Sequence, residues 1–209
     1  MPTDSKVRAL VFDIGEVIVR VNAWRAARSI AAHSSVGPRR LLQFIQQHGR
    51  LRDFQEGHLS IREWHSDFRN QLGLRMALRE FRAAWNSALD SKTILDESLF
   101  AQLAKRYRLV LLSNTDPIHV AHLERSYQFP RYFRHQLYSC ALGASKPDPA
   151  VYHEAIMCAG VEPGHILYTD DVPEYVEAGR KAGMQAVRFE SRSKFYAELR
   201  ERGVPPDRP

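Results

Sequence analysis

The most constraining feature of the sequence is a short apolar run that ends abruptly on a carboxylate and a glycine. The run Arg8–Phe12 has the composition of a strand buried on both faces of a sheet. Such a strand has no place for Asp13 in its interior, so we expect Asp13 at the strand's carboxyl end, where open α/β sheets bind ligands. Gly15 lets the backbone turn sharply and approach a ligand closely. Taken alone, Asp13 is equally consistent with a ligand-binding residue and with a turn-forming residue. Other parts of the chain are needed to distinguish the two.

The second half of the chain alternates between apolar strands and amphipathic helices. We predict further strands at 108–112, 137–141, 165–168 and 185–189, with helices between them over 95–107, from Asp116–Pro117, from Asp148, from Pro173 and from 191. This alternation indicates a parallel sheet layered by helices. Parallel strands align their carboxyl ends, so Asp13, Ser113 and the pair Asp170–Asp171 should gather at one edge. Local propensity does not require polar residues at three strand ends, which favours a functional role for them.

Residues 21–89 show helical periodicity throughout and interrupt the sheet after its first strand. We expect about four helices, one of which begins at a capping box formed by Ser60 and Glu63. Its aromatic residues, Trp24 included, are expected in the core of this segment. The predicted fold is therefore α/β: a Rossmann-like parallel sheet flanked by helices (residues 1–20 and 90–209), with an inserted helical bundle over residues 21–89.

Composition excludes several classes of protein. The 209 residues suffice for one sizeable domain with an insertion, and no apolar run approaches the roughly 18 residues of a membrane span. The polar start Met1–Lys6 predicts no signal peptide. Cys140 and Cys158 have no metal-binding spacing and are expected as core thiols of a cytoplasmic protein. We expect no membrane partner, and a monomer or weak homodimer.

The excess positive charge of the chain lies in one segment. Residues 20–90 hold twelve arginines, no lysine and six acidic residues, whereas acidic and basic residues balance in the remainder of the chain. Nucleic-acid binding, attraction of a small anionic substrate and a solvated arginine-rich helical face all fit this pattern. The charges are dispersed and no aromatic-basic motif accompanies them, so the solvated face is favoured and no nucleic-acid partner is expected.

The side chains expected at the sheet edge suit phosphoryl transfer. Carboxylate oxygens at two strand ends, completed by waters and a substrate phosphate, match the ligands that Mg²⁺ prefers. The hydroxyl of Ser113, adjacent amides and the compact charge of Lys146 in a proline-flanked loop suit phosphate oxygens. One carboxylate then remains to attack phosphorus and form an aspartyl-phosphate intermediate.

Four short motifs give the chain a resemblance to the haloacid dehalogenase superfamily of hydrolases. Residues 12–15, 112–114, 146–147 and 169–171 resemble the superfamily's four motifs, in order, and the match covers nearly the whole chain. The helical insert is similar to the mobile cap of that superfamily. The stretches 55–60 and 112–115 look most like the helical-cap subgroup that contains bacterial sugar-1-phosphate phosphatases such as alpha-D-glucose-1-phosphatase.

The resemblance implies a role for each matching residue. Asp13 would be the nucleophile and a metal ligand, Ser113 and Lys146 would hold phosphoryl oxygens, and the amides of Asn114 and of the turn Gly15–Glu16 would assist them. The Gly15 carbonyl and Asp171 would complete the metal ligands. Asp170 would act directly, through water or by hydrogen bonds, and spacing alone leaves its role exchangeable with that of Asp171.

The sequence departs from the resemblance at Gly15. Most phosphatases of the superfamily carry there a second aspartate that acts as general acid and then base, whereas the sugar-1-phosphatase-like subgroup also carries glycine. Metal binding needs only the backbone carbonyl at this position, so it is unaffected. The missing acid costs on the order of 10²–10⁴ in rate for a poor leaving group. We therefore expect a preference for leaving groups that need little protonation, with the Glu16 side chain pointing away from the ligand.

The resemblance implies a Mg²⁺-dependent phosphatase that hydrolyses a small phosphorylated metabolite, with a sugar phosphate as one candidate. A metal-independent 2-haloacid dehalogenase is the first alternative, but the acidic pair Asp170–Asp171 is poorly suited to stand beside a nucleophilic carboxylate without a cation. A non-catalytic phosphate-ligand binder of the same fold is the second. His119 and His122 have a spacing that metals use, but they lack an evident third ligand and are expected as packing or surface residues.

Overall fold

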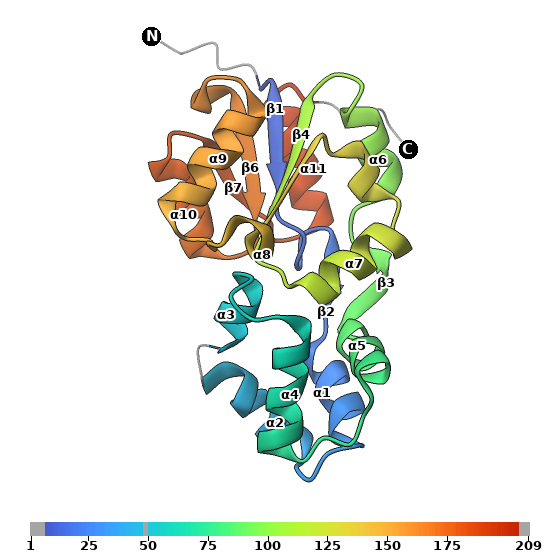
Figure 1. The fold of residues 1–209 in the computed structure, drawn as a ribbon. Coiled ribbons are helices and arrows are strands. Elements are labelled where there is room, and N and C mark those ends of the chain that lie inside the picture. The colour runs from blue at the N-terminus through green and yellow to red at the C-terminus, as the bar shows by residue number, and fades with distance from the viewer. Residues whose placement is uncertain (1–6, 48–49, 205–209) are drawn as a thin grey trace.

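A five-stranded parallel sheet lies at the centre of the structure, a computed structural model that describes residues 7–47 and 50–204. The strand order is β5-β4-β1-β6-β7 (Figure 1). The strands are β1 (Ala9–Phe12), β4 (Arg108–Ser113), β5 (His135–Tyr138), β6 (Ile166–Asp170) and β7 (Gln185–Arg188). Along β1 the side chains alternate, so that Leu10 and Phe12 enter one apolar cluster and Val11 enters another on the opposite face.

Helices cover both faces of the sheet, as the alternating sequence predicts. One face packs against α9 (Pro149–Ala159) and α10 (Pro173–Lys181), and the other against α6 (Glu97–Leu103) and α11 (Arg192–Glu201). Helix α7 (Pro117–Ser126) begins at the N-cap residue Asp116, as predicted, and the short α8 (Ser139–Leu142) follows β5.

The direction of the strand order changes at β1. The chain crosses from β1 to β4 on one side and later reaches β6 on the other, so Phe12 pairs with Leu111 and with Thr169. A crevice forms at such a switch point, outside the carboxyl ends of the strands. The loops after β1, β4 and β6 therefore meet, and they face the helices of residues 23–86 (Figure 1).

These helices form a layer with its own core, here called the helical segment. It comprises α1 (Ala23–Ala31), α2 (Pro38–Gln47), α3 (Arg50–Gln55), α4 (Ile61–Leu72) and α5 (Leu78–Asn86). Its centre is aromatic and fully buried at Phe54, Trp64, Phe68 and Phe81. The Ser60–Glu63 capping box starts α4, as predicted. Two short antiparallel strands, β2 (Val19–Val21) and β3 (Leu89–Thr93), pair where the chain enters and leaves the segment.

Several local predictions are wrong. The described chain has five helices in this segment rather than four, because α3 is too short to show a period in the sequence. The strand expected at 137–141 ends at Tyr138, and α8 takes the residues that follow; the helix expected over 95–107 spans Glu97–Leu103. Trp24 is 38% exposed rather than in the core. Cys140 and Cys158 are half-buried free thiols.

The arginines of the helical segment lie at its surface. Nine of the twelve in residues 20–90 are exposed and three are half-buried, the distribution of a solvated helical face. Over the described ranges, none of the helices has the length and hydrophobicity needed to cross a bilayer. The predictions made for residues 1–6 and for the tail at 205–209 concern residues outside the described ranges.

Candidate active site

A buried lysine joins two strand ends at the edge of the sheet. Lys146 Nζ lies 2.7 Å from Asp13 Oδ1, just after β1, and 2.6 Å from Asp170 Oδ2, at the end of β6. All three residues are buried, and the Asp170 side chain is fully enclosed. The structure thus brings together three of the residues that the sequence predicts for the site.

The backbone of Lys146 is fixed by the residue that follows the neighbouring strand. Asn114 Nδ2 donates to the Lys146 carbonyl at 2.9 Å, and Lys146 N donates to Asn114 Oδ1 at 2.8 Å. The ammonium group lies 5.1 Å from the centre of the Tyr175 ring, a cation–π contact. From the sequence, only the Asn114 amide is expected at the site. The two-way bond by the Asn114 side chain joins residues 32 positions apart, so no local sequence pattern indicates it.

The Asp170 carboxylate is held on both oxygens. Its Oδ2 accepts from Lys146 and from the hydroxyl of Tyr168, and its Oδ1 accepts from Val172 N at 2.9 Å. A carboxylate with this many donors keeps one orientation. Asp170 is therefore suited to position Lys146 and a neighbouring ligand.

Three carboxylates converge beside Lys146. One oxygen each from Asp13, Asp170 and Asp171 lie within 4.8 Å of one another. Opposite ligands of Mg²⁺ stand about 4.2 Å apart, at 2.0–2.1 Å from the ion, so a small contraction fits this set around one ion. Three acidic groups face a single lysine, which leaves excess negative charge in a largely buried place. The donor chemistry and the charge both fit a divalent cation.

Burial and charge shift the protonation equilibria of these groups. Burial, reinforced by the charges of Asp13 and Asp170, raises the pKa of Asp171 to about 6. Burial also raises the pKa of Asp13, against the opposing charge of Lys146. For Lys146, burial alone would lower the pKa, but the two bound carboxylates outweigh it and raise the pKa. Lys146 is thus a permanent cation.

The turn after β1 differs from the prediction at Glu16. Its amide, expected to bind phosphate, donates instead to the Val19 carbonyl at 2.9 Å. Glu16 has a φ of 51°, and its Oε1 accepts from Val21 N at 2.7 Å, which ties the side chain to the turn. The carboxylate therefore points away from the ligand side, as expected. The Gly15 carbonyl accepts from Val17 N at 2.6 Å and retains a second lone pair for a metal ligand.

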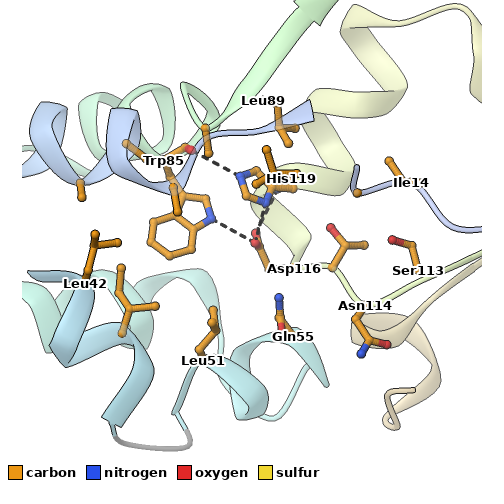
Figure 2. A pocket seen from close by; sticks show the side chains of 18 of the residues that line it. Ile14, Leu42, Leu51, Gln55, Trp85, Leu89, Ser113, Asn114, Asp116 and His119 are labelled. Atoms are coloured by element: carbon orange, nitrogen blue, oxygen red, sulfur yellow. Dashed lines mark hydrogen bonds and ion pairs between the residues drawn. The ribbon is translucent and has the colours of Figure 1, made fainter. Parts of the chain in front are cut away.

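A cavity of about 260 Å³ opens beside this edge, between the sheet and the helical segment. We call it the apolar cavity. Gly15, Ser113 and Asn114 line it on the side of the sheet, and Leu42, Leu51 and Trp85 line it on the side of the helical segment (Figure 2). Ser113, the last residue of β4, is 4% exposed. Three of the residues predicted to bind phosphate thus line the cavity, and Asn114 also bonds to the backbone of Lys146.

A family comparison decides the class of protein to which these residues belong. Residues 7–183 match the family model described as haloacid dehalogenase-like hydrolase. The chain belongs to this hydrolase family. The match includes every residue that the sequence assigns to the site and the whole helical segment.

Individual relatives of this hydrolase include a phosphatase of similar length. D-ribitol-5-phosphate phosphatase of Bacteroides thetaiotaomicron is 26% identical over 92% of this chain and 97% of its own. A solved HAD-family enzyme from that organism, in complex with magnesium and inorganic phosphate, has a TM-score of 0.80 at 21% identity, covering 89% and 96% of the two chains. L-2-haloacid dehalogenase from Xanthobacter autotrophicus has a TM-score of 0.62 at 18% identity, covering 96% and 85%. None of the three is described as a sugar-1-phosphate phosphatase, so that subgroup stays a prediction.

The contact between the helical segment and the sheet of this hydrolase uses residues to which the sequence assigned no structural role. Ser145 Oγ donates to Glu56 Oε1 at 2.5 Å, and Ser139 Oγ donates to the Gln55 carbonyl at 2.5 Å. A side chain at Gly57 would meet the Cys140 carbonyl at 2.3 Å, so only glycine allows this approach. The sequence marks residues 55–60 as a motif, but only the structure shows that they contact the loop beside Lys146.

A second contact uses Asp116, Trp85 and His119. Asp116 caps α7 through the amides of Ile118 and His119, and its Oδ2 also accepts from Trp85 Nε1 at 3.0 Å. His119 Nδ1 lies 2.9 Å from the same oxygen, and the imidazole stacks on the indole of Trp85. His119 is a packing residue here, and the structure shows no metal cluster around it within the described ranges.

Magnesium binding is expected to depend on pH through Asp171. At about pH 5 Asp171 is mostly protonated, and a protonated carboxyl is a poor ligand, so Mg²⁺ should raise the melting temperature less than at about pH 7.5. Without Mg²⁺, the contribution of Asp171 to stability changes with pH in the opposite direction. Because folding raises the pKa of Asp171, the folded chain binds more protons than the unfolded chain between pH about 4 and 6, and this contribution to stability grows as pH falls.

Thermal melts at both pH values, with and without millimolar Mg²⁺, measure the effect, and Asp171→Asn is the control. The variant should lose most of the magnesium response at both pH values. An equal magnesium response of the unmodified protein at both pH values would contradict a ligand role for Asp171.

Proposed function

We propose that this protein is a Mg²⁺-dependent phosphatase that hydrolyses a small phosphorylated metabolite through an aspartyl-phosphate intermediate on Asp13. The observation that carries the proposal is the arrangement at the sheet edge: Lys146 bridges Asp13 and Asp170, and Asp171 completes a cation site beside a cavity. A lysine and a divalent cation together balance the charge of a bound phosphate. The phosphatase activity of the Bacteroides relative supports the same conclusion.

In the first step, Asp13 attacks phosphorus. Lys146 holds Asp13 Oδ1, and Oδ2 lies on the side of Gly15. A carboxylate oxygen forms the new bond to phosphorus, and the bond to the ester oxygen breaks with its electron pair on the leaving group, which takes a proton from water. Lys146, the Ser113 hydroxyl and the Asn114 amide hold phosphoryl oxygens.

In the second step, water attacks phosphorus, the acyl–phosphate bond breaks, and inorganic phosphate and free Asp13 result. When bound by Asp13, Asp171 and the Gly15 carbonyl, Mg²⁺ would neutralise phosphate charge and so reduce repulsion of the incoming carboxylate. Asp170 positions Lys146, and it would hold the ion directly or through water. We further propose that residues 21–89 act as a cap domain that closes over the substrate and excludes bulk water.

Release of inorganic phosphate from a panel of phosphorylated metabolites, with Mg²⁺ and with EDTA, tests this proposal. Phosphate release that needs Mg²⁺ is expected. Chloride release from 2-chloropropionate that persists in EDTA would instead establish the dehalogenase alternative. Absence of both activities, together with phosphate binding to the folded protein, would indicate a non-catalytic binder.

Gly15→Asp is expected to raise turnover of alkyl phosphates by on the order of 10-fold or more. A Cβ placed at Gly15 would lie 3.7 Å from Asp13 Oδ2 and 3.7 Å from Val21 Cγ2, which is ordinary van der Waals contact, so the backbone there accepts a Cβ without a clash. The added carboxyl supplies the proton that an alkoxide leaving group needs. Steady-state kinetics on an alkyl and an aryl phosphate measure the gain, which should be larger for the alkyl ester. Gly15→Asn has the same shape and no proton to give, so a similar gain in that variant, or no gain in either, would contradict this explanation.

A further inference from the structure

The wall of the apolar cavity is mostly hydrocarbon on the side that faces away from the lysine site. Helix α1 contributes Ala27 and Ile30. Leu42 and Leu51 come from α2 and α3, and the same two helices add the polar side chains of Gln46 and Gln55 (Figure 2 labels Leu42, Leu51 and Gln55). Across the cavity, Gly15, Ser113 and Asn114 form its polar end. A phosphate held at that polar end directs its leaving group toward the apolar wall.

The charged pair in the wall is already hydrogen-bonded within the protein. Asp116 accepts from Trp85 Nε1 and from two backbone amides, and it pairs with His119 Nδ1. His119 Nε2 lies 3.3 Å from the Trp85 carbonyl, so both ring nitrogens are engaged. A substrate hydroxyl could bond to this pair only by displacing an existing partner. Apart from this pair, the amides of Gln46 and Gln55 are the polar side chains that α2 and α3 offer to a hydroxyl, and the rest of that wall is hydrocarbon. Each hydroxyl that faces the hydrocarbon without a partner lowers affinity by roughly 5- to 150-fold, which disfavours a polyol leaving group.

The size of the cavity suits one substituted ring. An apolar cavity of about 150 Å³ accommodates benzene. The apolar cavity here measures about 260 Å³, which leaves room for a ring with a few further carbon atoms.

The chemistry at position 15 independently favours an acidic leaving group. Gly15 supplies no proton donor, and the carboxylates of Asp13 and Asp170 are held by Lys146. His119 is occupied by Asp116 and Trp85. A phenolate leaves without prior protonation far more readily than an alkoxide does, so a phenol ester loses least from the missing acid.

We propose that the substrate is the phosphate monoester of a compact apolar phenol rather than of a sugar or polyol. This inference rests on the phosphatase activity proposed above and adds the class of the leaving group. It sets this chain apart from the Bacteroides relative, which acts on D-ribitol 5-phosphate.

The test compares kcat/KM for phenyl phosphate, 4-tert-butylphenyl phosphate, D-ribitol 5-phosphate and acetyl phosphate, all with Mg²⁺. The two phenols have nearly equal acidity, so their ratio isolates the contact with the apolar wall. We expect the butyl group to raise kcat/KM by about 10- to 100-fold, from the area it removes from water. D-Ribitol 5-phosphate should be hydrolysed at least about 100-fold less efficiently than either aryl ester.

Two variants of Leu42 test whether the gain in kcat/KM from the butyl group arises at the wall of the apolar cavity. Leu42→Asn places an amide in the wall, and the ratio of kcat/KM between the butyl ester and phenyl phosphate should fall by about 10-fold. Leu42→Met conserves volume and hydrophobicity, so the ratio should stay within about twofold. Because the ratio is measured on one preparation, a partly unfolded variant does not alter it.

The outcomes separate this inference from the proposed function. Hydrolysis of phenyl or acetyl phosphate without a gain in kcat/KM from the butyl group would overturn the apolar-phenol assignment, but it would still support the proposed phosphatase activity. Faster hydrolysis of D-ribitol 5-phosphate than of either aryl ester would do the same. Phosphate release from none of the four substrates would overturn both.

Discussion

Replacing Asp13 with asparagine is expected to lower kcat by on the order of 10⁴-fold or more, because a neutral amide cannot form the acyl phosphate. The fold should survive, since asparagine has nearly the same shape and its carbonyl can still accept from Lys146 Nζ. The backbone amide of residue 13 also keeps its 3.0 Å hydrogen bond to the Thr169 carbonyl, which holds the strand end in place. Phosphate release measured beside a thermal melt distinguishes lost chemistry from lost structure.

Asp148→Asn is the matched control for this change. Asp148 is exposed and caps α9 through the amide of Ala150, a role that asparagine fills equally well. It lies two residues from Lys146, so it reports whether a nearby aspartate-to-asparagine change alone disturbs the site. Its activity should stay close to that of the unmodified protein. More than about a hundredth of the normal kcat in Asp13→Asn would rule out Asp13 as the nucleophile.

Lys146→Met is expected to lose catalysis and also about 3–5 kcal/mol of the free energy of unfolding in metal-free buffer. The change leaves Asp13 and Asp170 buried without their shared cation. Burial then raises the pKa of Asp13 without the opposing charge of Lys146, so the folded variant binds protons more tightly than its unfolded chain. Its stability should therefore recover as pH falls, a response that a simple packing defect would not produce.

Lys194→Met is the matched control, because it removes a lysine from an ion pair that is exposed to solvent. Lys194 Nζ lies 2.7 Å from Glu190 Oε2, a distance like those at Lys146, but both side chains are more than half exposed. An exposed pair contributes little to stability because water screens its charges, so urea unfolding of this variant should differ little from that of the unmodified protein. If both variants lose similar small amounts of unfolding free energy, Lys146 does not stabilise the two buried carboxylates as the geometry indicates.

The residues predicted for the site could be found from sequence because each follows a buried strand or lies in a marked loop. Asp13, Ser113 and Asp170 occupy the ends of three parallel strands, and the sheet itself brings those ends to one edge. Apolar runs and capping residues give strong local signals for such a framework. The strand-end logic also predicts Asp171, and Lys146 was expected from its proline-flanked loop. The structure brings Asp13, Lys146, Asp170 and Asp171 together, and Ser113 lines the adjoining cavity.

What the sequence could not provide depends on contacts between distant residues. The pairing of Asn114 with Lys146, of Glu56 with Ser145 and of Trp85 with Asp116 joins residues 31 to 89 positions apart. Glu16 was misassigned in part because its amide closes a tight turn, which depends on a positive φ that propensity does not predict for glutamate. The composition of the apolar cavity arises only when the helical segment meets the sheet.

The double role of Asp116 limits how the specificity of such an enzyme can change over generations. The Asp116 carboxylate caps α7 and accepts a hydrogen bond from Trp85. Substitutions in that wall of the cavity therefore also weaken the start of α7 and the contact between the helical segment and the sheet. The opposite wall includes Leu42, a half-buried side chain that caps no helix, so its size can vary at less cost to the framework. New substrates would therefore be acquired through α2, while the side at α5 and α7 stays nearly constant.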